Sequence, residues 1–255
     1  MASISILCAV KDRTEHLLQS YKTWLDCDCV DEVVIVDWGS KEPISEKLEH
    51  HKKLKLVQIN PDHTKYWSFS QAYNTAARFA SCDYYLIMNA DEIMVSTKEL
   101  CSLEPPSNFF YEGTSWDSPK AHGVYFLYLS KEAFWKVNGY HEQMIGYGYD
   151  DVDLRRRLEK AEFSIKKSSV KIEHIKHGAD YRTRDNMMNY VVSWSYPWGA
   201  HERLIDLDYK SKNNIIYCDI GLRDRITYEK MLDREGVARV YSGAASWGYD
   251  EHFGV

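Results

Sequence analysis

The chain has 255 residues, of which 44% are hydrophobic and 27% are charged, and its net charge is -6. These values are typical of a globular protein with one large domain, or with one domain and an appendage. The net charge argues against a nucleic-acid partner, because no basic excess exists to neutralise phosphates. No apolar run approaches the length of a membrane span, and the first residues lack signal-peptide features. We therefore expect a soluble, cytoplasmic protein.

The cysteines and aromatic residues give weaker indications. Six cysteines are present, and Cys27 and Cys29 are the only tight pair. Their single-residue gap differs from the two-residue gap of common zinc knuckles, so reduced thiols are the simpler interpretation. The eight tryptophans and nineteen tyrosines are many for this length. Aromatic rings often pack on sugar C–H groups, although we expect most of these rings to lie in the core.

The first 95 residues alternate between strand and helix patterns. Short apolar runs indicate buried strands at 3–10, 32–37, 54–59 and 84–88. Helical patterns lie between them, at 14–25 after an N-cap at Asp12, at 43–51 and at 68–80. This alternation predicts an α/β fold with a mainly parallel sheet and helices on both faces.

The pattern is looser in the remainder of the chain. Loops are expected around 97–120, because two prolines and a glycine interrupt that stretch. Further elements are predicted as a strand at 123–130, a helical turn at 131–137, helices at 152–161 and 185–194, and one or two strands in 163–175. Residues 200–255 carry no pattern that predicts a structure.

Polar clusters follow three of the predicted strands: Lys11–Arg13, Asp37 and Asn89–Glu92. Ligands of open α/β sheets bind beyond the carboxyl ends of the strands. Asp37 is compatible equally with a contact to a nucleobase N–H and with a turn cap. Asn89-Ala90-Asp91 resembles an Asp-x-Asp metal motif with its first acid replaced, and Asp91 is a candidate ligand for Mg²⁺ or Mn²⁺. The alternative is a solvated turn.

A loop rich in glycine and tyrosine runs into an acidic helix start at 146–153. Asp150, Asp151 and Asp153 exceed what helix capping requires, although acids are favoured at a helix N-terminus. One of them is a candidate general base toward a sugar hydroxyl, and Asp153 is the most structural of the three. Tyr147 and Tyr149 are compatible with packing on a sugar or with anchoring the loop.

Two histidines and an arginine cluster complete the candidates. His174 and His177 would point to opposite faces of a single strand, so they form a chelating pair only if the chain turns. One imidazole is a candidate to complete the metal site. Arg155–Arg157 is interpreted as the solvated face of a helix. Lys65 and Trp67 precede a helix and are weaker candidates for phosphate or sugar contacts.

These residues resemble a known enzyme family. The segments Ala9–Arg13, Val34–Ser40, Ala72–Ala76 and Asp83–Glu92 look like the nucleotide-sugar half of GT-A glycosyltransferases, especially family 2. The segment Phe134–Leu158 looks like the C-terminal motif of galactosyltransferase family 7. The resemblance covers roughly the first 180 residues, and the C-terminal motif is the more specific part.

The resemblance implies a role for each matching residue. For the nucleotide, these are Asp37 on the base, Lys11 and Arg13 near the base or phosphates, and Asn74. For the metal they are Asp91 and His177, with His174 as the fallback. Asp151 matches the catalytic base, and residues near the donor or acceptor sugar are Asn89, Gly148, Tyr149 and Asp150. Two departures stand out: Asn89 replaces the usual first Asp, and Tyr73 stands where many relatives have Arg.

The expected activity is an inverting transfer from a nucleotide-diphosphate sugar, most simply a UDP-sugar, to a hydroxyl of a glycan or glycoconjugate, with Mn²⁺ or Mg²⁺. Residues 1–95 would bind the nucleotide sugar, 96–200 would bind the acceptor and catalyse transfer, and 201–255 would be an extension. A degenerate, non-catalytic binding protein and a retaining transferase are alternatives. A sugar nucleotidyltransferase is less favoured, because residues 9–14 hold no glycine for a phosphate loop.

Overall fold

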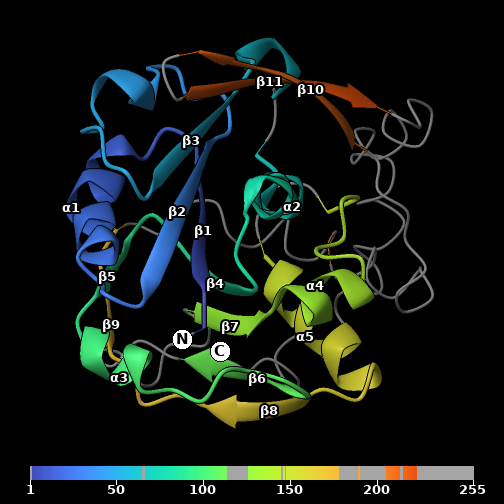
Figure 1. Cartoon of the computed structure of the whole chain (residues 1–255). Coiled ribbons are helices and arrows are strands. Elements are labelled where there is room, and N and C mark those ends of the chain that lie inside the picture. The colour runs from blue at the N-terminus through green and yellow to red at the C-terminus, as the bar shows by residue number, and fades with distance from the viewer. Residues whose placement is uncertain are drawn as a thin grey trace.

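The structure, a computed structural model, describes residues 2–64, 67–113, 126–144, 146, 148–177, 189, 205–212 and 215–222. Within these residues nine strands form one sheet in the order β10-β11-β3-β2-β1-β4-β7-β6-β8. Helices lie on both of its faces, with α1 on one side and α2 on the other (Figure 1). The predicted α/β class is therefore confirmed.

The first half of the chain follows the predicted alternation, except at 43–51. Its elements are β1 (Ile4–Val10), α1 (Thr14–Leu25), β2 (Val30–Asp37), the 3₁₀ turn η1 (Ile44–Glu46), β3 (Leu54–Ile59), the 3₁₀ turn η2 (Pro61–His63), α2 (Phe69–Phe79) and β4 (Tyr84–Met88). Strand β1 pairs in parallel with both β2 and β4, and β2 pairs in parallel with β3. The carboxyl ends of these strands therefore face the same edge of the sheet.

The second half adds antiparallel strands. Its elements are β5 (Glu92–Met94), α3 (Thr97–Cys101), β6 (Phe109–Gly113), β7 (Phe126–Ser130), α4 (Lys131–Lys136), α5 (Asp150–Lys160), β8 (Ser164–Lys167), β9 (Ile172–His174), β10 (Ile205–Lys212) and β11 (Ile215–Leu222). Strand β7 pairs antiparallel with β4 and β6, whereas β11 extends the sheet parallel to β3. Strands β5 and β9 form a separate antiparallel pair.

Four local predictions are wrong, the first being the loops expected around 97–120, where α3 and β6 lie. Asp12 does not cap α1: its backbone has φ of 54°, and its carboxylate accepts the N–H of Lys41 at 2.8 Å. The helix predicted at 43–51 is reduced to the turn η1. The expectation of reduced thiols fails for Cys29 and Cys101, which form a disulfide across 72 residues, a proximity that sequence spacing could not indicate. The helix predicted at 185–194 lies outside the described residues, apart from Asn189.

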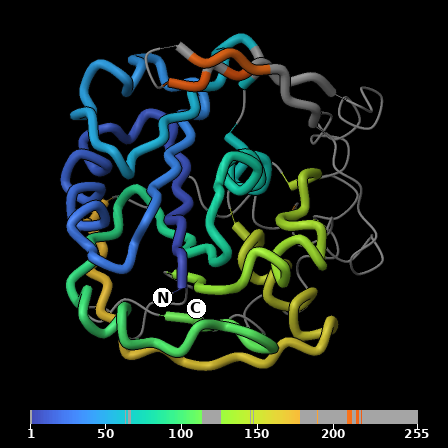
Figure 2. The backbone as a smooth tube through the Cα atoms, in the orientation of Figure 1, coloured from blue at the N-terminus to red at the C-terminus, as the bar shows by residue number. Residues whose placement is uncertain are grey.

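The hydrophobic core has two layers because helices cover both faces of the central strands. Every residue of β1 and almost every residue of β2 is buried, as expected of strands with apolar side chains on both faces. Helix α1 contributes Tyr21 and Trp24 to one layer, and α2 contributes Ala72 and Ala76 to the other. The small side chains of α2 let its backbone lie close to β1. Figure 2 shows β1 running between the two helices.

A buried ion pair between Arg157 and Asp153 connects α5 to the segment 137–139. Arg157 is 3% exposed and lies 2.6 Å from the Oδ2 atom of Asp153. Its Nη1 donates to the carbonyls of Val137 (2.5 Å) and Gly139 (2.6 Å). Gly139 has φ of +68°, and a Cβ there would lie 2.5 Å from the Asn74 side chain. The arginine therefore fixes the helix that carries the acidic motif.

The first prediction concerns this anchor. Replacing Arg157 by Ala leaves the carboxylate of Asp153 buried without its cation and two carbonyls without a donor. We expect the free energy of unfolding to fall by about 3–5 kcal/mol. Chemical denaturation measures it, and Glu159→Ala, on the exposed end of α5, is the matched control with a change within about 0.5 kcal/mol. Equal stability of the two variants would contradict the anchoring role.

Candidate active site

Two polar clusters lie side by side because β1 and β4 are parallel neighbours. The register pairs Leu7 with Ile87, so Lys11–Arg13 and Asn89–Glu92 follow adjacent strand ends. Arg13 Nη1 lies 3.3 Å from Asp91 Oδ2, which joins the two clusters directly. The convergence that the sequence predicted at this edge is therefore present for the first and fourth predicted strands.

Asp91 and two histidines form a cluster of possible metal ligands. Their ligand atoms all lie within 4.8 Å of one another. Asp91 Oδ2 lies 2.7 Å from His177 Nε2 and 3.3 Å from His174 Nε2. The sequence argument holds only for two histidines on one strand, and β9 ends at His174, so His177 lies beyond it. Both imidazoles thus reach the same carboxylate.

The charge of Asp91 is stabilised by its neighbours. Burial opposes its ionisation, but the hydrogen bond from His174 and the charges of His174, His177 and Arg13 outweigh burial. The pKa of Asp91 therefore lies below its ordinary value. The same anionic oxygen that would bind a cation is held in this structure by Arg13 and the two imidazoles.

Helix α1 holds the segment that carries Asp91. Ser20 Oγ donates to the Ala90 carbonyl at 2.7 Å. Trp24 Nε1 donates to the Glu92 carbonyl at 2.9 Å, and the Met94 N–H donates to Thr23 Oγ1 at 3.1 Å. On the other side, the Ile175 N–H donates to the Asp91 carbonyl at 2.8 Å. The backbone around Asp91 is therefore fixed from α1 and from the segment after β9.

Asn89 is oriented by a buried carboxyl group whose role sequence reasoning did not identify. Glu92 is 0% exposed, and burial raises its pKa well above the ordinary value. Asn89 donates to it twice, from its backbone N–H at 2.7 Å and from Nδ2 at 2.6 Å. The Tyr73 hydroxyl donates to the Met88 carbonyl (2.7 Å) and lies 3.2 Å from Asn89 Oδ1. The amide at 89 thus fits a position where a second carboxylate would face Glu92.

Two residues predicted to bind the nucleotide are buried and form hydrogen bonds with backbone groups of the protein. Asp37 is 1% exposed and accepts the backbone N–H groups of Ser40 (2.9 Å) and Ile44 (3.3 Å). This is the turn-cap alternative, and it leaves little carboxylate surface for a nucleobase. Asn74 is 0% exposed and bonds the Tyr140 backbone with both its oxygen and its nitrogen. The prediction that Asn74 contacts the nucleotide does not fit this burial.

Lys11 lies partly buried among backbone carbonyls. Its Nζ donates to the carbonyls of Trp38 (3.1 Å), Gly39 (3.2 Å) and Thr64 (2.6 Å). Burial lowers the pKa of Lys11. Lys11 therefore ties together the loops after β2 and β3 at the edge where a nucleotide was predicted. Of the two weaker candidates beside this loop, Trp67 is described and packs edge-on against Phe69, while Lys65 lies outside the described residues.

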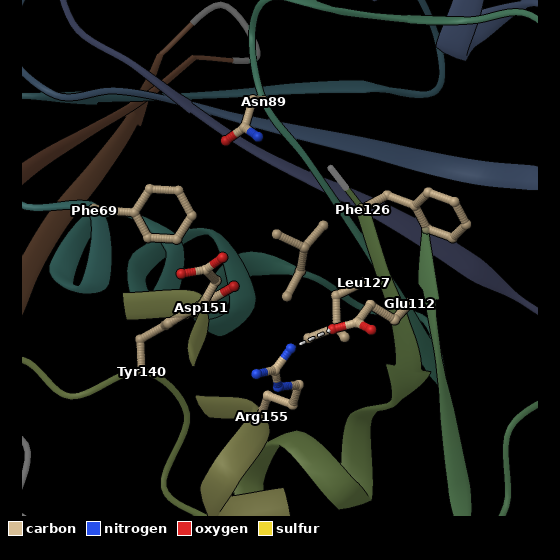
Figure 3. Close-up of a pocket in the computed structure, with 9 residues that line it drawn as sticks. Phe69, Asn89, Glu112, Phe126, Leu127, Tyr140, Asp151 and Arg155 are labelled. Atoms are coloured by element: carbon tan, nitrogen blue, oxygen red, sulfur yellow. Dashed lines mark hydrogen bonds and ion pairs between the residues drawn. The ribbon is translucent and has the colours of Figure 1, made fainter. Parts of the chain in front are cut away.

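Asp151 lines a pocket together with Asn89. The pocket lining consists of Phe69, Ile87, Asn89, Glu112, Phe126, Leu127, Tyr140, Asp151 and Arg155. In Figure 3 the side chains of Asn89 and Asp151 reach toward the same space, one from the end of β4 and the other from the start of α5. The pocket therefore unites the motif after β4 with the acidic motif. Asp37 is not among its lining residues.

Asp150 points into the protein and not into this pocket. It is 4% exposed, and Ser70 Oγ donates to its Oδ1 at 2.6 Å. Burial, with smaller contributions from the charges of Asp151 and Asp153, raises the pKa of Asp150 to about 7 despite the Ser70 hydrogen bond. The predicted contact of Asp150 with a sugar does not fit this orientation.

The glycine- and tyrosine-rich loop is anchored by its own side chains. Tyr149 is buried with φ of 70°, and its hydroxyl accepts a hydrogen bond from Arg156. The Gly148 carbonyl accepts a hydrogen bond from Asn189 Nδ2 at 2.8 Å. Anchoring, the alternative to sugar packing, is thus what the structure shows for Tyr149. Tyr147 lies outside the described residues.

The arginines of α5 are not a solvated face, which corrects that interpretation. Arg155 lines the pocket and donates to Glu112 Oε1 at 3.0 Å (Figure 3). Glu112 also pairs with Lys167, and its side chain is 3% exposed. The i, i+4 spacing of Asp151 and Arg155 could have indicated that Arg155 lines the pocket, because it puts both residues on one helix face.

Part of the sequence matches a known family model. Residues 113–179 match the family model described as the N-terminal domain of galactosyltransferase, a range that includes α5 and both histidines. No curated protein matches the sequence significantly.

Several solved structures have the same fold. The catalytic domain of Drosophila beta1,4galactosyltransferase 7 in complex with xylobiose is 14% identical, with a TM-score of 0.59 over 91% of this chain and 98% of that chain. A mannosyltransferase from Pyrobaculum calidifontis in complex with GDP-Man and Mn²⁺ is 13% identical, with a TM-score of 0.59 over 96% and 75%. GalNAc-T7 with UDP, GalNAc and Mn²⁺ is 10% identical, with a TM-score of 0.62 over 76% and 48%.

The predicted class is confirmed at this level. The structural likenesses, at these low identities, establish the GT-A fold, and the family match adds a galactosyltransferase-like region. The protein therefore has the GT-A glycosyltransferase fold and contains a region that matches a galactosyltransferase family model.

The second prediction uses the raised pKa of Asp150. The folded-state pKa of about 7 exceeds the ordinary value of 3.8, so the folded protein binds the extra proton between these pH values. Stability contributed by this proton is present at low pH and is lost as the pH rises toward 7. Asp150→Asn removes the titrating group, so its free energy of unfolding should exceed that of the wild type at pH 8, with a smaller difference at pH 5.

Urea denaturation at the two pH values measures this effect. Asp62→Asn, on an exposed 3₁₀ turn, is the control for a carboxylate without burial. A wild type and an Asp150→Asn variant with the same pH dependence would contradict the assignment of a neutral, buried carboxyl at position 150.

Proposed function

We propose that this protein is an inverting glycosyltransferase that moves a sugar from a nucleotide-diphosphate donor, specifically a UDP-sugar, to a hydroxyl of a glycan or glycoconjugate. The observation that carries the proposal is the pocket that Asp151 shares with Asn89. Asn89 stands two residues before Asp91, the carboxylate of the metal-capable cluster. Asp151, as the base, is thus linked through Asn89 to the cluster that would bind the cation of the diphosphate.

The residues present fit a divalent cation. One carboxylate oxygen and two imidazole nitrogens within 4.8 Å of one another are a donor set suited to Mn²⁺, and related folds have been solved with Mn²⁺. Asp91, His174 and His177 would hold the ion, and Arg13 would be released to the diphosphate. When bound, the cation supplies Lewis-acid stabilisation of the charge on the departing diphosphate.

Asp151 acts as the general base. Its carboxylate takes the proton of the acceptor hydroxyl while that oxygen attacks the anomeric carbon and the bond to the diphosphate breaks. The neighbouring Asp150, with its pKa of about 7, is largely protonated below that pH and so does not add a second full charge beside the base. Separation of two adjacent carboxyl groups into one neutral and one ionised group is a recurring arrangement in acid–base catalysis.

The division of labour along the chain follows from these roles. Residues 1–95 bind the nucleotide sugar, and 96–200 bind the acceptor and supply the base and the two histidine ligands of the cation. The extension after 200 contributes β10 and β11 to the sheet edge beside β3. Among the residues that the structure describes, no helix combines the length and the hydrophobicity needed to cross a bilayer.

One alternative function has a supporting observation, and a second differs in mechanism. Asn89 in place of an acid, and Arg13 on Asp91, favour a degenerate protein that binds sugar nucleotides without turnover. A retaining mechanism remains chemically compatible with the same pocket. Hydrolysis of a UDP-sugar with Mn²⁺ distinguishes an enzyme from a binding protein, and the anomeric configuration of the product distinguishes inversion from retention. A panel of nucleotide sugars, screened for thermal stabilisation with and without Mn²⁺, identifies the donor.

The third prediction tests the base. Asp151→Asn should lower the turnover number by about 10²–10⁴-fold, because the amide cannot accept the hydroxyl proton, while nucleotide binding is unchanged. Steady-state transfer kinetics and UDP titration measure the two effects. The control is Glu159→Gln, at the exposed end of the same helix. Full turnover of Asp151→Asn would refute the base assignment.

The fourth prediction tests the metal ligand. Asp91→Ala should remove the Mn²⁺-dependent part of UDP binding, because it deletes the carboxylate on which both histidines converge. Calorimetric titrations with and without Mn²⁺ measure this part, with Asp62→Ala as the exposed control. A Mn²⁺ dependence equal to that of the wild type would exclude Asp91 as a ligand.

A further inference from the structure

Three cysteines form a cluster on elements that do not line the pocket. Cys27 and Cys29 lie between α1 and β2, and Cys101 ends α3. Cys29 and Cys101 form a disulfide, and Cys27 Sγ lies 3.5 Å from Cys29 Sγ and 3.9 Å from Cys101 Sγ. The three sulfur atoms lie within 4.8 Å of one another. The proposed transfer reaction uses none of them.

The sulfur spacing around Cys27 is that of a thiolate metal site. Zn²⁺ binds thiolates at about 2.3 Å in tetrahedral geometry, which separates the sulfur atoms by about 3.8 Å. Two of the three separations in the cluster, 3.5 and 3.9 Å, already have this size. Reduction of the Cys29–Cys101 bond frees the third pair to separate. Sequence spacing did not indicate this site, because the third ligand is 72 residues from the nearer member of the Cys27–Cys29 pair.

The loop that carries the first two cysteines is held in place. Lys53 Nζ donates to the carbonyls of Cys27 (3.0 Å) and Leu25 (3.1 Å). The Val30 N–H also donates to the Cys27 carbonyl at 3.2 Å. These hydrogen bonds fix the backbone position of Cys27 in the loop. Cys27 is buried, Cys29 is half-buried and Cys101 is exposed, so one side of the cluster faces solvent and admits a fourth ligand.

We propose that the reduced protein binds one thiophilic d¹⁰ cation, such as Zn²⁺, through Cys27, Cys29 and Cys101. Two equivalents of a small thiol reduce the Cys29–Cys101 disulfide and are themselves joined as a disulfide. The cation then replaces the three thiol protons, which pass to solvent, and water occupies the fourth position. Disulfide and cation exclude each other, and each ties α3 to the loop after α1.

The test is Co²⁺ titration of the reduced full-length protein under anaerobic conditions. Thiolate ligands give Co²⁺ a sulfur-to-metal charge-transfer absorption, which the oxygen and nitrogen ligands of Asp91, His174 and His177 do not give. We expect this band to saturate at one equivalent and to disappear on addition of Zn²⁺. Cys27→Ser and Cys101→Ser should lose it, whereas Cys82→Ser, which changes a cysteine outside the cluster, should keep it.

Two outcomes overturn the proposal. These are no charge-transfer band in the reduced wild type, and a band that persists in Cys27→Ser. Because a variant can fail to fold, circular dichroism accompanies each titration, and alkylation of the wild type provides a second measurement. Zn²⁺ should abolish alkylation of the exposed Cys101 thiol in the reduced protein, and unchanged labelling would refute its ligation. The titration needs no sugar or nucleotide, so its result is independent of the proposed transferase activity.

Discussion

The parallel pairing of β1 with β4 is the constraint on which the candidate site depends. It sets the polar residues after the two strands side by side, and the 3.3 Å contact of Arg13 with Asp91 is its direct consequence. Both strands are buried on both faces, so a register shift would expose apolar side chains or bury polar ones. Helix α1 adds hydrogen bonds from Ser20, Thr23 and Trp24 to the segment after β4. The pairing of β1 with β4 and the hydrogen bonds from α1 thus determine the position of the Asp91 backbone.

Sequence patterns were sufficient for the central strands and for the motifs, because these depend on local composition. The runs at 54–59 and 84–88 became β3 and β4 with the same bounds. Burial of individual polar side chains was not accessible in this way. Asp37 and Asn74 are of the residue types expected near a nucleotide, yet the side chains of both form hydrogen bonds with backbone groups of neighbouring loops. A motif specifies a residue's place along the chain, while tertiary packing decides which way its side chain points.

The histidine pair is a second feature that local sequence patterns could not predict. A period of two along a strand separates His174 and His177 onto different faces, but this holds only while the strand continues. Strand β9 ends at His174, which pairs with Glu92, the first residue of β5. Beyond this end His177 Nε2 lies 2.7 Å from Asp91 Oδ2. The ligand cluster therefore depends on where a two-stranded ladder stops.

Asn89 and Glu92 explain why an altered metal motif is compatible with an intact site. The amide of Asn89 donates to a fully buried carboxyl group, and burial raises the pKa of that group well above its ordinary value. An aspartate at 89 would bring a second acid against Glu92 in the same desolvated space, at a cost that an amide avoids. In this chain Glu92 accepts hydrogen bonds from Asn89, and the Tyr73 hydroxyl lies 3.2 Å from Asn89 Oδ1. Asn89 lines the same pocket as Asp151, so the amide at this position is compatible with the pocket.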